Sequence, residues 1–176
     1  MRSRSKSRLM TPGRWVLAIV SALLLLFLLF NLYYRSTQQD IWQEENAAKR
    51  IAIEQAGLTE VDKATKHVWD QISWVIQGKD SQGREQMVWV VGDQATIEPV
   101  EAGIAKEKIE AKVLKDKPDA RIIRIIPGLL NGERIWEVFY SREESVRKYY
   151  YEFYRFSDGS FITIYNLPSK FSDGVD

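Results

Sequence analysis

The sequence lacks cysteine altogether and has a single histidine, His67, among its 176 residues. Without cysteine no disulfide can form, so stability must come from an ordinary hydrophobic core. The same shortage excludes a lipid-modified cysteine, cysteine nucleophiles and most transition-metal sites, which need several Cys and His ligands. His67 lies in a strand-like run beside Trp69, and a lone imidazole there is better explained by packing than by catalysis.

The signatures of common enzyme classes are also missing. The chain contains no Gly-x-Ser-x-Gly elbow, Walker loop or dinucleotide-binding glycine pattern. Two adjacent carboxylate pairs exist, but Glu44-Glu45 begins a helix-forming segment and Glu143-Glu144 lies in a presumed turn, so we interpret both as structural. We therefore expect no enzyme activity, no cofactor and no metal site. A carboxylate pair brought together only by folding is the alternative that remains open.

Acidic residues are absent before Asp40, whereas an uncharged apolar run extends from Trp15 to Leu32. Eighteen helical residues span about 27 Å, close to the hydrocarbon thickness of a bilayer. Five basic residues precede the run, and basic residues next to a membrane span stay on the cytoplasmic side. We predict a single-pass anchor whose end residues are Trp15 and Leu32, with a cytoplasmic N-terminus and the remaining chain outside the cell. A cleaved signal peptide is less suitable, because its apolar region is shorter and ends at a small-residue cleavage site.

The charges are distributed unevenly along the chain. Six of the 25 Lys and Arg residues lie at or before Arg35, whereas all 24 acidic residues follow it, so residues 36–176 carry a net charge of −5. A mildly acidic domain is a poor nucleic-acid binder. The basic tail instead suits anionic membrane lipids, which we expect the chain to contact through its anchor.

After the apolar run, helix-forming and strand-forming segments alternate. A helix is predicted over residues 43–56, with one face formed by Ala48, Ile51, Ala52 and Gln55. It either continues the membrane helix or follows a short link at Ser36-Thr37. Strand-like runs come next at 61–69, 72–77 and 86–91, then a second helix at about 100–115, and then strands at 120–126, 133–141, 147–156 and 160–165.

This order predicts an α+β fold, with an N-terminal transmembrane helix followed by two tandem helix-plus-antiparallel-sheet units. The expected organisation is a basic cytoplasmic tail (1–14), a transmembrane helix (15–34), a first unit (35–96), a second unit (97–167) and a frayed C-terminus (168–176).

The last predicted hairpin is unusually aromatic on both faces. A two-residue turn at Asp158-Gly159 would pair Phe156 with Phe161. Tyr151, Phe153, Ile162 and Ile164 would then form the floor for the second helix. The other face would carry Tyr150, Tyr154, Phe156, Phe161 and Tyr165. This second face either packs against the first unit or binds a partner, because Tyr and Phe are enriched at interfaces.

The chain resembles the YpmB/TseB family of Gram-positive membrane proteins, whose modules are cystatin-like or PepSY-like. The resemblance lies in the basic tail, the single span, the Glu/Ala-rich helix ending at Ala56-Gly57-Leu58, the Gly-linked strand pair and the aromatic strand 148–153 before Asp158-Gly159. It implies a non-enzymatic regulator of cell-wall elongation that binds a penicillin-binding transpeptidase outside the membrane.

Two other functions remain open from the sequence. PepSY-like units also occur in protease propeptides, which implies a regulator or inhibitor of an extracytoplasmic peptidase. A cleft between the two units could instead bind a wall polymer or a small ligand, although no convergent polar cluster is visible in the sequence and we expect no small-molecule substrate.

Overall fold

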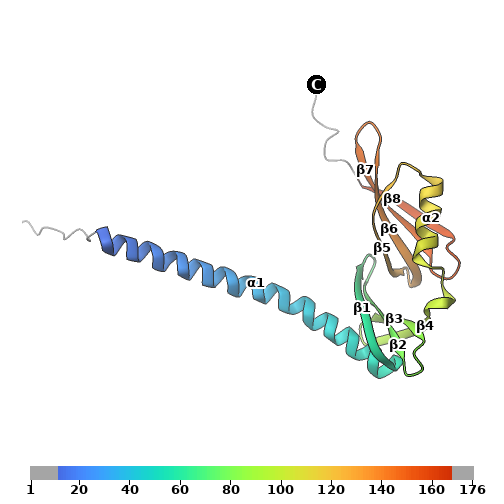
Figure 1. Ribbon diagram of the computed structural model, residues 1–176, viewed down its shortest axis with the longest axis horizontal. Coiled ribbons are helices and arrows are strands. Elements are labelled where there is room, and N and C mark those ends of the chain that lie inside the picture. Colours follow the sequence, from blue (N-terminus) through green and yellow to red (C-terminus); the bar gives the residue numbers. More distant parts are fainter. Residues whose placement is uncertain (1–11, 168–176) are drawn as a thin grey trace, which may run out of the picture. The chain divides into compact units, whose positions relative to one another are not determined.

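The computed structural model describes the backbone of residues 12–167 and the side chains of that range except residues 12, 32 and 34–40. Most of the predicted basic tail and all of the predicted frayed C-terminus lie outside the described residues. The chain divides into two compact units, Met1–Glu44 and Glu45–Asp176. Its elements follow one another as α1, β1–β4, η1, α2 and β5–β8 (Figure 1). The boundary predicted near residue 96 falls inside the second unit and stays a prediction.

Helix α1 runs from Pro12 to Ala56 and includes both the predicted apolar helix and the predicted helix after it. Its segment Gly13–Asn31 has a mean hydropathy of 2.3, and none of it is buried against the protein. A helix of this length and composition is compatible with a single membrane span or a signal anchor. Trp15 is exposed, whereas the side chain of Leu32 lies outside the described side chains.

The first sheet is antiparallel and has the strand order β1-β2-β3-β4. Its strands are β1 (Leu58–Val68), β2 (Ile72–Asp80), β3 (Glu85–Val91) and β4 (Gln94–Pro99). The last turns of α1 cover one of its faces, where Ala48 and Ala52 pack with Trp74 and Ile76. These two small side chains allow the helix backbone to approach the sheet closely, and the predicted helix face is confirmed.

Strand β4 is the one strand that the sequence analysis missed. Most of its residues are exposed, so it lacks the apolar alternation that marks a half-buried strand. The better signal is the turn before it: Val91 pairs with Gln94 across Gly92-Asp93, and Gly92 has a φ of 55°. Glycine at the first position of a two-residue turn is typical of a β-hairpin.

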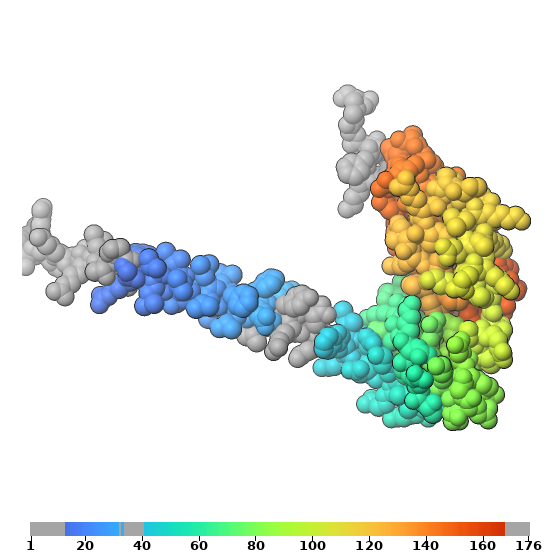
Figure 2. Space-filling model, viewed as in Figure 1, coloured from blue at the N-terminus to red at the C-terminus, as the bar shows by residue number. Residues whose placement is uncertain are grey.

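The second sheet is also antiparallel, with the strand order β5-β6-β7-β8. Its strands are β5 (Arg121–Leu130), β6 (Glu133–Glu143), β7 (Arg147–Arg155) and β8 (Phe161–Leu167). Helix α2 (Lys106–Asp116) lies against these strands (Figure 2, yellow on orange), and its Ile109 and Val113 are fully buried there. The predicted α+β class, an apolar helix followed by two antiparallel sheets, is confirmed.

The second helix begins later than the sequence predicts. Its expected first turn is the separate 3₁₀ turn η1 (Val100–Ala102), followed by extended backbone at Gly103. A Cβ atom at Gly103 would lie 2.2 Å from the ring of Phe156. The next residue, Ile104, donates its N–H to the Phe156 carbonyl at 2.8 Å and accepts a hydrogen bond from the Trp136 indole at 3.0 Å. The chain leaves helical geometry because these contacts require an extended backbone.

The loop between β7 and β8 is longer than the predicted two-residue turn. Phe161 pairs with Tyr154 rather than with Phe156. Phe156 is instead buried in the core, and the Arg155 N–H closes the loop by donating to the Ser160 carbonyl at 2.8 Å. The predicted pairing is wrong because core packing of Phe156 takes it out of the strand.

A bulge in β8 then changes which residues share a face. Ile162 is the extra residue, after which Tyr165 pairs with Tyr151. Because side chains alternate along a strand, a shift of one residue moves the following side chains to the other face. Tyr165 therefore does not share a face with Tyr150 and Tyr154, and that prediction is wrong.

Helix α2 covers the face opposite to the predicted one. The sequence analysis placed it over Tyr151 and Phe153, but Lys112 of α2 lies 5.3 Å from the centre of the Tyr154 ring. Strand β6 explains the choice. On the face opposite the helix it carries Glu137, which an apolar helix surface would leave without a partner. On the helix side it carries Trp136, Val138 and Tyr140.

The two sheets share a core within the second unit. The first sheet contributes Val75, Met87 and Trp89, and the second contributes Leu129, Trp136, Val138 and Phe156. The Trp89 ring meets Phe156 edge-on, with 4.9 Å between the ring centres, and its indole N–H donates to the Gly128 carbonyl at 3.3 Å. Trp89 and Phe156 thus join the first sheet to the second.

Candidate functional site

The five aromatic residues predicted to bind a partner do not lie on one surface. Tyr154 and Phe156 are each 1% exposed and belong to the core. Tyr150 is half-buried, and its hydroxyl donates a hydrogen bond of 2.6 Å to a carboxylate of the β6–β7 loop. Phe161 and Tyr165 are 52% and 45% exposed, but they lie on opposite faces of the sheet. A role in partner binding stays a prediction, and two of the five have almost no surface with which to perform it.

A different set of rings forms a continuous cluster on the second sheet, opposite α2. We call it the aromatic face, and its members are Trp69, Phe139, Tyr149, Tyr151, Phe153 and Tyr165. Phe139 stacks on both Tyr149 and Tyr151, with ring centres 5.9 and 4.6 Å apart. Trp69, which follows β1, packs at one end, 5.2 Å from both Tyr151 and Tyr165. Phe153 is fully buried, whereas Tyr149 and Tyr165 are 36% and 45% exposed, so the cluster extends from the core to the solvent.

A cation lies over the centre of the aromatic face. The Arg124 guanidinium is 5.4 Å from the Phe139 ring centre and 5.7 Å from that of Tyr151. Its Nε and Nη2 donate to Oε1 of the buried Glu137 at 3.1 and 2.8 Å. An arginine stacked on rings and held by a carboxylate keeps a fixed orientation. Tyr, Trp and Arg are the residues most often found at the centres of protein–protein interfaces.

Glu137 is the electrostatic link between this face and the first sheet. Its Oε2 lies 3.2 Å from Nε2 of the buried His67 in β1. Burial alone would raise the pKa of Glu137, but the contacts from His67 and Arg124 outweigh it and hold the pKa below its ordinary value of 4.5. The His67 ring lies directly on Gly128 of β5, where a Cβ atom would come within 2.3 Å of it. His67 is thus a packing residue, as the sequence predicts.

The buried carboxylates are arranged as structural pairs. Glu152 lies on the α2 face, where Lys117 is 2.9 Å from its Oε1; Glu137 lies on the other face, so the two do not converge. The Glu143-Glu144 pair is exposed, and each carboxylate is paired with a cation four residues later. Within residues 12–167, no group of three or more His, Cys, Asp and Glu side chains could hold a metal ion.

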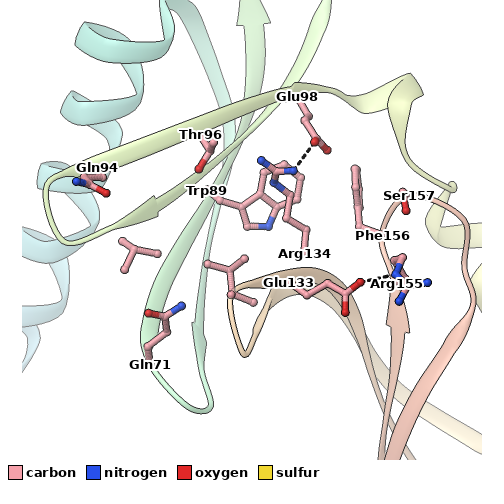
Figure 3. Close-up of a pocket in the computed structure, with 13 residues that line it drawn as sticks. Gln71, Trp89, Gln94, Thr96, Glu98, Glu133, Arg134, Arg155, Phe156 and Ser157 are labelled. Carbon is pink, nitrogen blue, oxygen red and sulfur yellow. Dashed lines mark hydrogen bonds and ion pairs between the residues drawn. The ribbon is translucent and has the colours of Figure 1, made fainter.

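A cavity of about 570 Å³ opens between the two sheets (Figure 3). Arg134 is paired with Glu98 of β4, and Arg155 is paired with Glu133. The Arg134 guanidinium lies 5.2 Å from the centre of the Trp89 ring. Uncharged polar side chains line the other side of the opening: Gln71, Gln94 and Thr96.

The sequence analysis missed both sites for the same reason. Four members of the aromatic face lie on the odd-numbered positions of β6 and β7, which the alternation rule groups correctly. Trp69, however, joins them from the first sheet, and the cavity depends on pairs such as Glu98–Arg134, which are far apart in the sequence. The available signal was the aromatic strand 147–156. It identified β7 correctly, but the sequence analysis chose the face with Tyr150 and Tyr154 instead of the face with Tyr149 and Tyr151.

The fold is that of a small α+β module that follows an apolar helix. Residues 47–90 match the model of a family described as "Cell wall elongation regulator TseB-like domain". No curated protein matches the chain. Among solved structures, the YpmB protein from Bacillus subtilis is similar, with a TM-score of 0.62 over 70% of this chain and 97% of that chain. The two sequences are 23% identical, so this likeness concerns the fold.

Residues 47–90 therefore resemble a TseB-like domain, and the YpmB/TseB resemblance seen in the sequence is confirmed. The family is named as a regulator of cell-wall elongation, which supports a regulatory role. A regulator of this kind fits a domain outside the cytoplasm, and the apolar segment of α1 is compatible with holding it at a membrane.

Proposed function

We propose that the protein is a single-pass, membrane-anchored, non-enzymatic module that regulates cell-wall elongation by binding a penicillin-binding transpeptidase outside the membrane. Its two sheets would act as PepSY-like, cystatin-like units. The N-terminus is cytoplasmic in this proposal, because the basic residues precede the apolar segment.

The aromatic face is the observation that carries the proposal. Monomeric proteins rarely leave contiguous apolar surface open without an interaction to explain it. Here Phe139, Tyr149 and Tyr151 are already stacked in the free protein, and Arg124 is held over them. Rigid rings lose little conformational entropy on binding, so a partner gains affinity without first ordering the surface.

The transpeptidase is chosen as the partner from the family description, which places the TseB-like domain in cell-wall elongation. A protein partner also suits the chemistry of the face, since Tyr, Trp and Arg are the residues that most often carry interface energy. A long apolar helix would hold the module close to wall-building enzymes that are themselves at the membrane surface.

In-cell photo-crosslinking tests the proposal. The full chain would carry p-benzoylphenylalanine in place of Tyr149, and cells would then be irradiated and labelled with a fluorescent penicillin. We expect a crosslinked adduct that contains a penicillin-labelled protein. The matched control places the same photo-reactive residue at Glu110, which is exposed on α2 on the other side of the sheet.

The two positions give opposite expectations. An adduct formed from Tyr149 and not from Glu110 supports the aromatic face as the transpeptidase site. Adducts without penicillin label, or equal yields from both positions, contradict the proposal. External protease should also remove a C-terminal tag from intact cells, and a protected tag would contradict the proposed orientation.

A further inference from the structure

The cavity between the two sheets has the size and position of a ligand site. Its volume of about 570 Å³ lies within the range of small-molecule pockets. Its walls come from β3 and β4 of the first sheet and from the β5–β6 turn and the end of β7 in the second. A ligand there would contact both sheets at once.

The floor of the cavity is apolar and rigid. Trp89, Leu129 and Phe156 are buried, and they belong to the core shared by the sheets. The Trp89 indole is fixed by its hydrogen bond to the Gly128 carbonyl. Because these side chains are almost fully buried, a ligand can contact only their edges, and its polar groups must be recognised at the walls.

The charged wall is balanced. Each of its two guanidinium groups has a carboxylate partner: Arg134 with Glu98 and Arg155 with Glu133. The four side chains are between 30% and 42% exposed, so a ligand can reach them. A phosphate or another strong anion would have to compete with the carboxylates, and a strong cation with the guanidinium groups. The wall therefore favours an uncharged ligand that both donates and accepts hydrogen bonds.

The opposite wall adds uncharged polar groups. Gln71, Gln94 and Thr96 line it (Figure 3), and within residues 12–167 none of their side chains is engaged in a hydrogen bond. Two carboxamides and a hydroxyl supply donors and acceptors together. Hydroxyl and acetamido groups around an otherwise apolar ring match this alternation of donors and acceptors.

We propose that this cavity binds an N-acetylated saccharide, one or two rings long, of the type that forms wall glycan. Hydroxyl groups would pair with the Arg–Glu wall, the acetamido group would reach Gln94 and Thr96, and the sugar ring would touch the edges of the apolar floor. The choice of wall glycan rests on the proposed function, whereas the preference for an uncharged, hydroxyl-rich ligand rests on the cavity itself.

Saturation-transfer NMR with the full chain in detergent micelles provides the first test. N,N′-diacetylchitobiose is the probe, cellobiose is the comparator without acetamido groups, and the peptide Ala-Glu-Lys is the charged comparator. We expect transfer to the chitobiose acetamido methyl groups and weaker transfer to cellobiose. Absence of transfer to chitobiose, or stronger transfer to the peptide, overturns the proposal.

Variants locate the binding. Gln94→Ala combined with Thr96→Ala should weaken chitobiose binding about tenfold by titration, since two hydrogen-bonding groups are lost. Both side chains are exposed, so the thermal midpoint should not change. Gln82→Ala, an exposed glutamine in the β2–β3 turn outside the cavity, is the matched control and should bind as the original chain does. Equal affinity for the double variant and the original chain overturns the assignment to this cavity.

This test can fail separately from the proposed function. The double variant should still crosslink to the penicillin-labelled protein from position 149, because the aromatic face lies elsewhere on the second sheet. Loss of chitobiose binding with crosslinking retained supports two distinct sites. Absence of chitobiose binding in the original chain overturns the saccharide proposal and leaves transpeptidase binding to be decided by crosslinking.

Discussion

The two sheets of this protein have the same number of strands and the same strand order, yet they differ in how they are covered. The first sheet is packed on both faces, by the end of α1 on one side and by the second sheet on the other. The second sheet is covered by α2 on one face and carries the aromatic face on the other. The first sheet is thus a structural support with both faces covered, whereas the second sheet leaves the aromatic face partly open to solvent.

The family match lies on the supporting part. Residues 47–90 comprise the end of α1 and strands β1–β3. Apart from Trp69, the aromatic face lies beyond this segment, on β6, β7 and β8. The likeness to TseB-like domains therefore concerns the first sheet and the end of α1, and the proposed partner surface has to be argued from its own residues.

Removing the ring that joins the two sheets should have the largest effect. Phe156 packs on Trp89 of the first sheet and Trp136 of the second. Phe156→Ala should lower the free energy of unfolding by about 3–5 kcal/mol, because a buried ring leaves a cavity. Phe161→Ala, which removes an exposed ring of the same hairpin, should cost less than about 1 kcal/mol. Urea unfolding of the full chain in micelles measures both, and similar losses would contradict the assigned burial.

Alanine substitutions of one side chain in each sheet should show how differently the two sheets are covered. Ile76, under α1 in the first sheet, is fully buried, and Ile76→Ala should cost about 2–4 kcal/mol. Tyr149→Ala, on the aromatic face, should cost at most about 1 kcal/mol but should reduce recovery of the penicillin-labelled protein with the chain. A Tyr149 variant that is as unstable as the Ile76 variant would show that the aromatic face is part of the core.

The Glu137 carboxylate should make the junction between the sheets sensitive to acid. Its pKa is lowered in the folded state, so its stabilising contribution is complete above its ordinary pKa of 4.5 and is lost as the pH falls below that value. The groups facing it are Arg124 and His67. Glu137→Gln should lower stability by about 2 kcal/mol at pH 7, and the difference from the original chain should shrink below pH 4.5.

Denaturant unfolding at a series of pH values checks this prediction. Asp80, whose carboxylate caps an exposed turn of the first sheet, is a useful comparison because its pKa is lowered to about 2. Its burial acts to raise the pKa, but hydrogen bonds from Arg84, Gln82 and Gln86 outweigh that effect. Asp80→Asn should lower stability above the ordinary pKa of 3.8, and its difference from the original chain should shrink only as the pH falls further, toward about 2. A constant difference for Glu137→Gln across the whole range would show that its charge contributes nothing.

The smallest predicted effects compare the two-residue turns of the sheets. Asn131 has a φ of 52°, and Gly92 has a φ of 55°. Alanine at either position should cost about 1 kcal/mol, since a side chain with a Cβ atom disfavours this region. Asn131→Gly is the control and should be neutral. Thermal unfolding distinguishes these outcomes, and an unchanged midpoint for Asn131→Ala would indicate that the turn relaxes.

The sequence was sufficient for most elements of the fold, because most strands are rich in β-branched and aromatic residues between turn signals and the apolar run contains no charge. It was insufficient where long-range packing decides. Gly103 interrupts the expected first turn of the second helix because of a ring 53 positions later in the chain. The extra residue at Ile162 moves the following side chains of β8 to the other face. The cavity could not be predicted from the sequence because its two walls come from different sheets. Its Arg–Glu pairs join residues that are far apart in the sequence and so leave no local pattern.

The contact between His67 and Gly128 has a consequence for how this protein can change over time. The ring of His67, the chain's sole imidazole, lies flat on the backbone of β5 at Gly128. Even a methyl group at position 128 would push the two sheets apart. A larger residue at position 128 is therefore possible only together with a smaller one at position 67.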